Sequence, residues 1–347
     1  MKKFLGRFPQ TRRVRMTHLL LLSFLGFLVS ACASPFRHSE RETEMHESLP
    51  AGVINHLIRQ IKQNGGDINK YFVSDDEGFP VVMAELEYEN DLFEVRYDLE
   101  SANLLEDSSY NVRFFLRKTD LETVYEDTLI WKPSSGNAGI LLSMDDDYFE
   151  SWEKYFDLFD KYNACITFFI IGENVNFSRK ALNRGHDVGF HSISHRDLRG
   201  KSLTVLDAEV LKPVKSLRSR GIPVLSFAFP FGFSDPIIRE ILLQDFGILR
   251  GYGTTFRLYS DHEIRSGYII SKAIDNTVIK TDEKFYRLIT AMLRTAVFLD
   301  DNMFLPLTTH DISDTASWGI TPGRLEFLLN TAAGLNLKFY CYRDFAL

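Results

Sequence analysis

The feature that most constrains the fold is an alternation of short apolar runs with amphipathic stretches, which begins near residue 136 and continues to the end of the chain. The runs have the length and composition of buried strands, and the stretches between them have helical periodicity. The runs are 140–144, 164–171, 186–190, 224–229, 248–252, 267–270, 304–308 and 337–342. Strands that alternate with helices indicate repeated βα units. Seven or eight strands in about 210 residues fit an irregular or incomplete α/β barrel.

Local signals mark two of the expected helices. A helix over 203–217 should kink or restart at Pro213, because proline removes a backbone donor and clashes with the preceding turn. The last helix has Thr321 as its N-cap, Pro322 in its first turn and Gly334 as its stop.

The preceding segment, residues 49–135, has a different rhythm. Apolar residues within 53–61 form one helical face. Strand-like runs joined by polar turns follow at 93–99, 110–116 and 124–131. We therefore expect a small β-rich accessory domain before the barrel domain, residues 136–347. The acidic run 75–78 lacks the ligand spacing of a calcium loop and is interpreted as a solvated turn.

The first 31 residues have the order of an export signal. Six basic residues and no acidic residue precede the apolar stretch 19–29, which is too short to span a bilayer comfortably. Val29-Ser30-Ala31-Cys32 resembles the cleavage box of bacterial lipoproteins, in which the cysteine becomes the lipidated first residue. We expect residues 1–31 to be a lipoprotein signal peptide. The alternative is an ordinary signal peptide followed by a chance cysteine.

The expected mature chain is then anchored by lipidated Cys32 to the extracytoplasmic face of a bacterial membrane, on the periplasmic side if an outer membrane is present. Residues 32–48 are polar and are predicted to form a tether. Removal of the six basic residues changes the formal net charge from −7 to about −13. Such a surface does not favour nucleic acid, and we expect no nucleic-acid partner.

Two further cysteines, Cys165 and Cys341, lie in apolar, strand-like runs. Buried free thiols are the default interpretation of such residues, although export permits a disulfide. The sequence alone does not place the two cysteines within bonding distance.

Adjacent carboxylates end the first apolar run of the alternating region. Asp145 and Asp146 close this run, and His191 and His195 follow the third run. One carboxylate and two imidazoles can hold a divalent metal with coordination positions left open. The second carboxylate is then free to handle protons. An open metal beside a base is the arrangement of a hydrolase centre.

Four motifs in this region resemble those of the NodB-homology polysaccharide deacetylases, in the same order. The segment 143–147, Ser-Met-Asp-Asp-Asp, is similar to the family's Thr-Phe-Asp-Asp-Gly, and 185–195 matches its Gly-His-x-x-Gly-x-His-Ser/Thr-x-x-His. The segment 227–232 is similar to the third motif in its aromatic-Pro-aromatic-Gly part, and 307–310 matches Leu-x-x-His. The resemblance covers residues 136–347 and implies the family's irregular barrel.

The resemblance implies Asp146, His191 and His195 as metal ligands and Asp145 as the catalytic base. A ligand set of two histidines and one aspartate suits zinc but tolerates other divalent ions. Zinc is therefore the expected metal. A bound metal lowers the pKa of its water toward about 7 and polarises an amide carbonyl, so that Asp145 can take a proton from the water.

The resemblance also implies the groups that face the substrate. His310 would be the general acid, because a histidine that titrates near neutral pH can protonate the departing amine. Leu307 would line the pocket for the acetyl methyl, and the backbone N–H of Phe231 would donate to the oxyanion. Trp318, eight residues beyond His310, is a candidate stacking surface for a sugar ring, or else a residue that packs its loop onto the barrel.

Two departures from the family pattern affect the carboxylates. Asp147 stands where the family has glycine, and we expect Asp147 to face solvent. Ala228 stands where many members have an arginine that orients the catalytic aspartate. Arg250, at the end of the next strand, is our hypothesis for a spatial replacement, and a surface arginine that closes the strand is the equal alternative. Asp275 is a weaker candidate for the carboxylate that supports the acid histidine.

We therefore predict a metal-dependent hydrolase that removes N-acetyl groups from an acetamido-sugar polysaccharide. An O-acetyl esterase acting on a glycan would use the same centre. A glycan-binding lipoprotein with a degenerate site is the alternative from another class, because the motif arginine is missing.

Overall fold

The computed structural model describes residues 57–59, 61, 71–76, 79–88, 91–107, 109–118, 124–131, 138–254, 256–299 and 303–346. The predicted signal peptide, Cys32 and the predicted tether lie outside the described residues. Residues 57–59 and 61 are helical, within the apolar stretch for which a helix was expected.

A five-stranded antiparallel sheet precedes the barrel, in the order β1-β2-β3-β4-β5. Along β3 the side chains of Phe93, Val95, Tyr97 and Leu99 are buried while their neighbours are partly exposed, as expected of a sheet with one covered face. The strands are β1 (Tyr71–Asp76), β2 (Phe79–Tyr88), β3 (Asp91–Leu104), β4 (Tyr110–Lys118) and β5 (Val124–Trp131).

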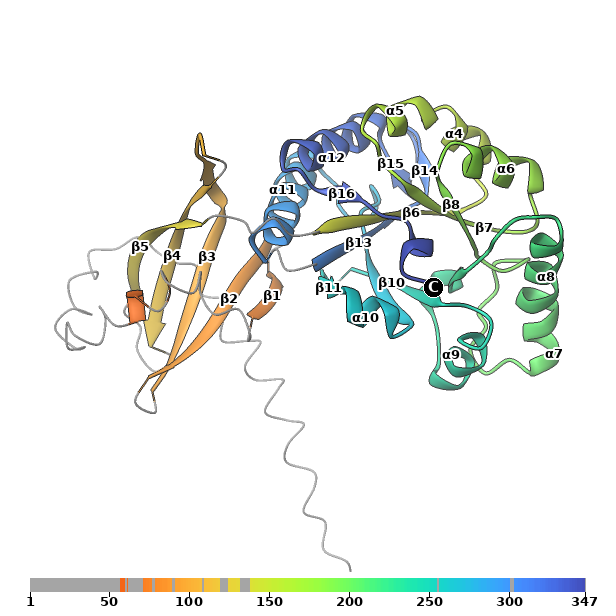
Figure 1. Cartoon of the computed structure of the whole chain (residues 1–347), viewed down its shortest axis with the longest axis horizontal. Coiled ribbons are helices and arrows are strands. Elements are labelled where there is room, and N and C mark those ends of the chain that lie inside the picture. The colour runs from red at the N-terminus through yellow and green to blue at the C-terminus, as the bar shows by residue number, and fades with distance from the viewer. Residues whose placement is uncertain are drawn as a thin grey trace, which may run out of the picture. The chain divides into compact units, whose positions relative to one another are not determined.

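Seven parallel strands close into a barrel, which confirms the predicted irregular α/β barrel (Figure 1). Each strand pairs with the next, and the last pairs back to the first through Phe304 to Thr309 beside Gly139 to Met144. The barrel strands are β6 (Gly139–Asp146), β7 (Ile166–Ile170), β8 (Asp187–Phe190), β9 (Ser226–Ala228), β10 (Ile248–Gly253), β12 (Tyr268–Ala273) and β13 (Met303–Thr309). Two short strands extend the sheet, β16 (Lys338–Phe339) on β6 and β11 (Tyr259–Ser260) on β13.

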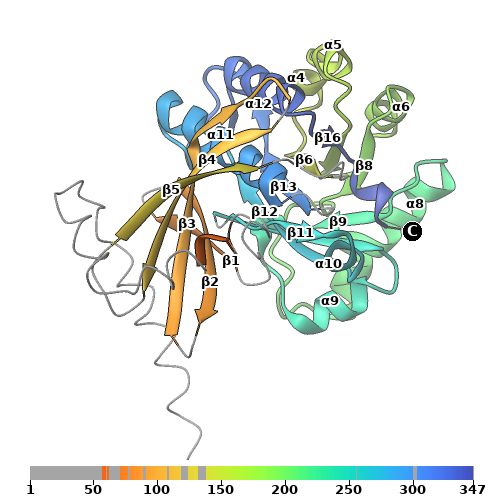
Figure 2. The same ribbon diagram turned by 60° about the vertical axis from the view of Figure 1, so that its left-hand side comes forward.

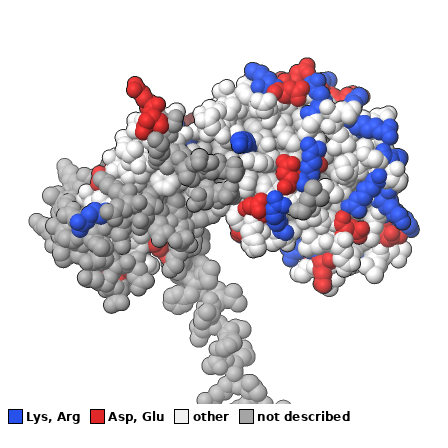
Figure 3. All heavy atoms as spheres, viewed as in Figure 1, with Lys and Arg blue, Asp and Glu red and all other residues white. Residues whose placement is uncertain are grey.

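Helices surround the barrel strands, as the two ribbon views show (Figures 1 and 2). They are α4 (Phe149–Glu153), α5 (Phe156–Lys161), α6 (Val175–Asn183), α7 (Leu203–Leu206), α8 (Lys212–Ser219), α9 (Pro236–Leu242), α10 (Asp261–Arg265), α11 (Asp282–Leu299) and α12 (Pro322–Gly334). None of the described helices is both long and apolar enough to cross a membrane. Acidic and basic side chains are interspersed over the barrel face visible in Figure 3.

Proline acts in the predicted helix over 203–217 as expected. The segment divides into α7, a π-helical turn at Asp207–Leu211, and α8, which starts again with Pro213 in its first turn. In α12 the Thr321 hydroxyl accepts from the Arg324 N–H at 3.2 Å, which caps the helix. The helix includes Gly334, and the left-handed residue that follows it is Asn336.

Two elements differ from the prediction: helix α11 was not predicted, and the last predicted strand is shorter than expected. In α11, consecutive residues at 291–293 and 295–299 are buried rather than a single stripe. The predicted strand 337–342 is only β16, because Cys341 leads directly into a 3-10 turn at Tyr342–Asp344.

The inside of the barrel contains an apolar cluster that is separate from the main core. This cluster includes Leu141, Phe169, Ile248 and Tyr342, which are all fully buried. Small residues on neighbouring strands leave room among these side chains: a Cβ on Gly189 would overlap with the Phe169 ring. The long side chain of Arg250, from β10, is fully buried beside Phe169 in this interior.

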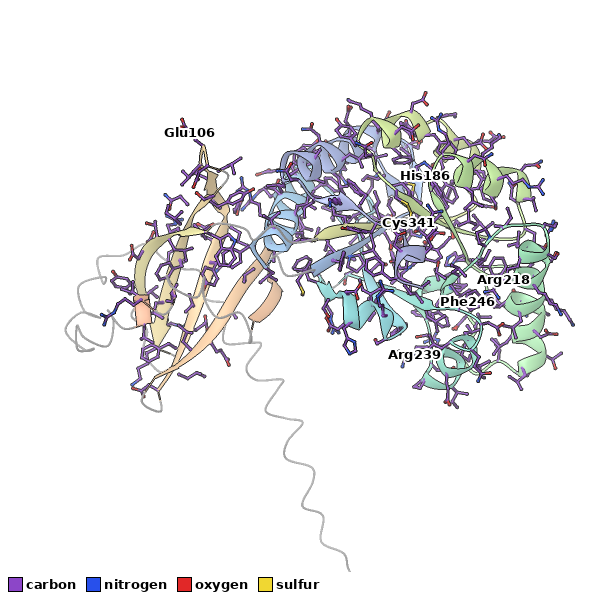
Figure 4. The ribbon with its side chains drawn as sticks, viewed as in Figure 1. Glu106, His186, Arg218, Arg239, Phe246 and Cys341 are labelled. Carbon is purple, nitrogen blue, oxygen red and sulfur yellow. A yellow bond between two sulfur atoms is a disulfide. The ribbon has the colours of Figure 1, made fainter. Side chains whose placement is uncertain are left out.

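Cys165 and Cys341 form a disulfide, which is the alternative that export permits rather than the default interpretation of two free thiols (Figure 4). Their Cα atoms are 5.6 Å apart, although 176 residues separate them in sequence. Cys165 immediately precedes β7, and Cys341 lies two residues after β16. Both of these strands pair with β6 on the side away from β13. The pairing of β16 and β7 with successive parts of β6 brings the two cysteines together, which no local pattern could predict.

The small sheet and the barrel both fall within one compact unit, Arg41–Leu347. Within this unit, Arg294 on α11 donates to the backbone oxygen of Leu99 on β3 at 2.9 Å, and the Tyr97 and Phe298 rings are 4.8 Å apart. The domain boundary at residues 135 and 136 stays a prediction.

Candidate metal and acid-base centre

The two adjacent carboxylates lie at the carboxyl end of β6. Asp145 is 2 % exposed, whereas Asp146 is partly exposed and Asp147 is exposed. Asp146 has a φ of 87°, in the left-handed region that few residues other than glycine adopt. This backbone turn separates neighbours in sequence, so that Asp145 stays in the barrel interior while Asp146 lies at its rim.

The two histidines follow β8 and lie beside Asp146. The Nε2 atoms of His191 and His195 are each 3.5 Å from Asp146 Oδ1. One ligand atom from each of these three residues can be chosen so that all lie within 4.8 Å of one another. The structure thus brings together the three residues that the sequence suggested as metal ligands.

The loop that carries the histidines has an unusual backbone and specific supports. Ser192 has a φ of 68° and His195 a φ of 51°. The Ser192 hydroxyl accepts from the His195 N–H at 2.9 Å. Glu209, in the π-helical turn, accepts from the Ser194 hydroxyl at 2.8 Å and from the Ser194 N–H at 3.2 Å. The Glu209 backbone oxygen also accepts from the Ile193 N–H at 3.0 Å.

The chemistry of the three ligand residues fits a cation. Asp146 Oδ1 is buried without a hydrogen-bond partner. Burial raises the pKa of Asp146, as does the charge of Asp145, although the charges of His310 and His195 oppose the shift. A cation beside Oδ1 would satisfy this oxygen and favour the ionised carboxylate.

His191 is held in the form that can bind a metal. Its Nδ1 donates to the backbone oxygen of Ala228 at 2.8 Å, which leaves the lone pair on Nε2, the atom beside Asp146. Burial lowers the pKa of His191 to about 3, despite the opposing charge of Asp145. The imidazole is therefore neutral at neutral pH.

Arg250 enters the barrel interior from β10 and pairs with Asp145. Its Nη2 donates to Asp145 Oδ1 at 2.5 Å and also to Oδ2. The Arg250 side chain is fully buried, and its guanidinium lies 5.0 Å from the centre of the Phe169 ring. Burial alone would raise the pKa of Asp145, but the Arg250 charge holds it below its usual range. Asp145 is therefore an ionised carboxylate at neutral pH.

His310 follows β13 and pairs with Asp275, which follows β12. His310 Nδ1 is 3.0 Å from Asp275 Oδ1, and the Trp152 indole donates to the His310 backbone oxygen at 2.8 Å. Burial lowers the pKa of His310, but the Asp275 hydrogen bond and the charges of Asp275 and Asp145 outweigh burial and raise the pKa to about 9. His310 is therefore protonated at neutral pH.

The residues expected to face the substrate differ in their exposure. Leu307 is fully buried on β13, whereas Phe231 is 52 % exposed and Trp318 is 51 % exposed. The Phe231 ring lies 4.5 Å from the His195 ring, and the Trp318 ring lies 5.8 Å from the His310 ring. The two exposed rings thus lie beside different histidines of the centre.

Sequence reasoning missed two residues that contact the centre. Tyr252 donates from its hydroxyl to Asp275 Oδ2 at 3.2 Å, and Glu209 holds the histidine loop. Tyr252 lies two positions after Arg250 on β10, so strand alternation could have placed both side chains on one face. No local signal marked Glu209, because its role depends on the fold of a separate helical segment.

Residues 132–247 match the family model described as polysaccharide deacetylase. The match covers about a third of the chain and identifies a polysaccharide deacetylase domain there. The matched segment contains Asp145, Asp146, His191 and His195, whereas Arg250, Asp275 and His310 follow it. The structure brings these three later residues to the same end of the barrel as the matched segment. No curated protein sequence matches the chain.

Several solved structures are similar to part of this chain. A family 4 carbohydrate esterase from Streptomyces lividans has 15 % identity and a TM-score of 0.43, over 59 % of this chain and 93 % of that chain. A peptidoglycan deacetylase from Bacillus subtilis has 15 % identity and a TM-score of 0.41, over 60 % and 90 % of the two chains. A chitin deacetylase from Colletotrichum lindemuthianum has 15 % identity and a TM-score of 0.42, over 61 % and 89 %.

Proposed function

We propose that this protein is a metal-dependent hydrolase that removes N-acetyl groups from a polysaccharide containing acetamido sugars. The observation that carries the proposal is the cluster of Asp146, His191 and His195, whose ligand atoms lie within 4.8 Å of one another at the end of the barrel. The charged pairs of Asp145 with Arg250 and of His310 with Asp275 lie at the same end. A metal cluster with a separate base and acid suits hydrolysis of an amide.

Asp146, His191 and His195 would hold the cation, with zinc as the expected metal. A divalent cation bound there supplies a water of lowered pKa and polarises the acetyl carbonyl. Asp145 accepts the proton of the attacking water, and its ionised state suits that role because the Arg250 charge lowers its pKa. Arg250 also fixes the direction of the Asp145 carboxylate by bonding both oxygens.

His310 donates the proton that the departing amine nitrogen needs. The Asp275 hydrogen bond to Nδ1 leaves Nε2 as the donor atom, and the raised pKa keeps the imidazole protonated at neutral pH. Leu307 would border the acetyl methyl, and the Phe231 backbone N–H would donate to the developing oxyanion. Trp318, exposed beside His310, would stack on a sugar ring.

The amino-terminal sequence supports a proposal for location. Its basic, apolar and small residues, followed by Cys32, favour export and lipid anchorage on the extracytoplasmic face of a bacterial membrane. A Cys32→Ala variant should then lose its membrane association in cell fractionation, whereas an ordinary secretory signal predicts the same distribution for both proteins.

The test of the function is acetate release from a panel of N-acetylated and O-acetylated oligosaccharides, before and after chelation and with zinc added back. We expect release from the N-acetylated substrates, loss on chelation and recovery with metal. Asp145→Asn and His310→Ala should each lower kcat by about 10²- to 10⁴-fold, the usual contribution of general acid-base groups.

Asp147→Asn is the matched control, because this exposed carboxylate directly follows the other two, and its kcat should change by less than about twofold. Absence of metal binding, or acetate release that survives both Asp145→Asn and His310→Ala, would contradict the enzyme proposal and favour a glycan-binding protein. Release from O-acetylated substrates alone would instead indicate an esterase.

A further inference from the structure

Two exposed phenylalanine rings extend outward from the metal cluster. The Phe231 ring lies 4.5 Å from the ring of the ligand His195, and the Phe233 ring lies 5.9 Å from Phe231 with 37° between the ring planes. Phe231 is 52 % exposed and Phe233 is 44 % exposed. Large aromatic residues usually bury most of their surface, so adjacent exposed rings beside a reaction centre indicate a contact surface for a ligand.

Phe231 and Gly232, which begin the segment that joins the two rings, both have left-handed backbone conformations. Phe231 has a φ of 59°, which is unusual for a bulky residue, and Gly232 has a φ of 70°. A Cβ on Gly232 would lie 2.6 Å from the backbone N and O of Tyr252, so only glycine fits against β10 at this point. The close contact with β10 and the strained turn fix where Phe231 projects.

Phe233 makes a cation–π contact with an arginine. The Arg199 guanidinium lies 4.0 Å from the centre of the Phe233 ring. Asp197 orients Arg199 by accepting from its Nε at 3.0 Å and from its Nη2 at 2.6 Å. The Arg199 side chain is still 48 % exposed, so polar atoms of a ligand can reach it.

A side-chain bridge joins the loops that carry Phe233 and Arg199. Asp235 Oδ2 accepts from the Gly200 N–H at 3.0 Å, and Asp235 Oδ1 accepts from the Ile238 N–H at 2.9 Å as the N-cap of α9. The two loops and α9 are therefore linked, and Phe233 and Arg199 lie on a surface that is ordered without a ligand.

We propose that Phe233 and Arg199 form a second sugar subsite, which binds the ring adjacent to the sugar being deacetylated on the same polysaccharide chain. This inference rests on the proposed function. The C–H face of a pyranose is apolar and can pack on Phe233, while the hydroxyl and acetyl oxygens at the ring edge can accept from Arg199. The occupant is a neighbouring sugar because the Phe231 and Phe233 rings continue directly from the ligand His195.

The subsite is tested with substrates of different length. The kinetic constants of wild type and Phe233→Ala are compared on a methyl glycoside of N-acetylglucosamine and on its tetramer, and the Kd of the tetramer is measured by calorimetry. Phe233→Ala should raise the KM and the Kd for the tetramer by about three- to tenfold, the size of one aromatic contact, and leave kcat/KM for the methyl glycoside unchanged. Phe233→Trp should restore tetramer affinity, because it keeps an aromatic face.

Ile237→Ala is the control, because Ile237 on nearby α9 is 70 % exposed and lies outside the ring pair. Tetramer binding equal to wild type in Phe233→Ala, or an equal loss for both substrates, would overturn the subsite. If wild type releases no acetate from any substrate, the proposed function fails, whereas the calorimetric comparison of wild type with Phe233→Ala still decides the subsite.

Discussion

At the scale of single residues, the centre depends on two buried ion pairs whose partners come from different strands. Asp145 pairs with Arg250 across the barrel interior, and His310 pairs with Asp275 at its rim. A buried charge is tolerated only with a partner, so loss of one member should affect both protonation and folding. Two of the predictions concern these pairs.

Replacement of Arg250 should impair Asp145 more than it impairs metal binding. In Arg250→Ala the Asp145 carboxylate stays buried without its cation, so its pKa should rise and kcat should fall by more than about tenfold at neutral pH. The free energy of unfolding should fall by roughly 3–5 kcal/mol, as when one partner of a buried pair is removed. The measurements are the pH dependence of kcat, metal content and urea unfolding.

Arg250→Lys is the matched variant, because it keeps the positive charge on a shorter side chain without the planar guanidinium. It should recover part of the activity. Full activity and unchanged stability in Arg250→Ala would show that Arg250 neither orients the Asp145 carboxylate nor lowers its pKa.

Replacement of Asp275 should move the alkaline limit of activity. The pKa of His310 is raised to about 9, so the acid form persists through neutral pH and kcat should fall as the pH rises through about 9. Asp275→Asn removes the hydrogen-bonded carboxylate, which should lower this pKa and shift the decline toward neutral pH. The measurement is kcat against pH for both proteins.

The same ion pair predicts how the stability of the fold changes with pH. Because the pKa of His310 in the folded protein lies above its usual value of 6.5, the pair stabilises the fold fully below about pH 6.5, and this contribution is lost as the pH rises through about 9. Asp275→Asn should therefore lower the midpoint of thermal unfolding more at pH 6 than at pH 10. If kcat of Asp275→Asn declined at the same high pH as kcat of wild type, Asp275 would be excluded as the residue that sets the pKa of His310.

At the scale of elements, the π-helical turn between α7 and α8 supports the loop that carries the two proposed histidine ligands. The turn points both the carboxylate and the backbone oxygen of Glu209 toward the histidine loop. That loop contains Ser192 and His195 in left-handed conformations, which persist only where the surroundings hold them. A π-helical turn in a helix often occurs at a functional site for this kind of reason.

Glu209→Ala should therefore weaken metal binding by about 10- to 100-fold, the usual effect of losing a group that orients a metal ligand. The dissociation constant for zinc is measured by competition with a chelator, which reads the site without reference to turnover. Glu240→Ala, an exposed acid on α9, is the control and should leave zinc affinity unchanged. Wild-type affinity in Glu209→Ala would indicate that the loop holds its conformation without this support.

At the scale of the whole molecule, the disulfide ties the end of the chain to the barrel. After Cys341 the chain places Tyr342 inside the barrel, where its ring lies 5.1 Å from the Phe169 ring, and the Tyr342 N–H donates to the Thr167 hydroxyl at 3.0 Å. The terminal segment thus contributes Tyr342 to the buried cluster beside Arg250. Its attachment should matter for the stability of the barrel.

Loss of the disulfide should destabilise the folded protein by roughly 2–4 kcal/mol, because the link closes a long loop in the unfolded chain. The sequence separation of 176 residues places the expected effect toward the upper part of that range. Urea unfolding with and without a reductant measures the effect. A Cys165→Ser, Cys341→Ser double variant should match the reduced wild type and respond no further to the reductant; equal stability of all forms would mean that the link contributes nothing to the fold.

The sequence by itself determined the alternation of strands and helices and pointed to the three residues of the proposed metal cluster, because these depend on local periodicity and on motifs of a few residues. The Thr321 cap and the restart of the helix at Pro213 were predictable for the same reason. Whether Arg250 reaches Asp145, whether Glu209 holds the histidine loop and whether Cys165 meets Cys341 were decided only by the tertiary structure. The first contact crosses the interior of the closed barrel, the second depends on how a helical segment packs beside the histidine loop, and the third depends on two distant strands pairing with β6. Each of these arrangements is a property of the folded chain rather than of any window within the sequence.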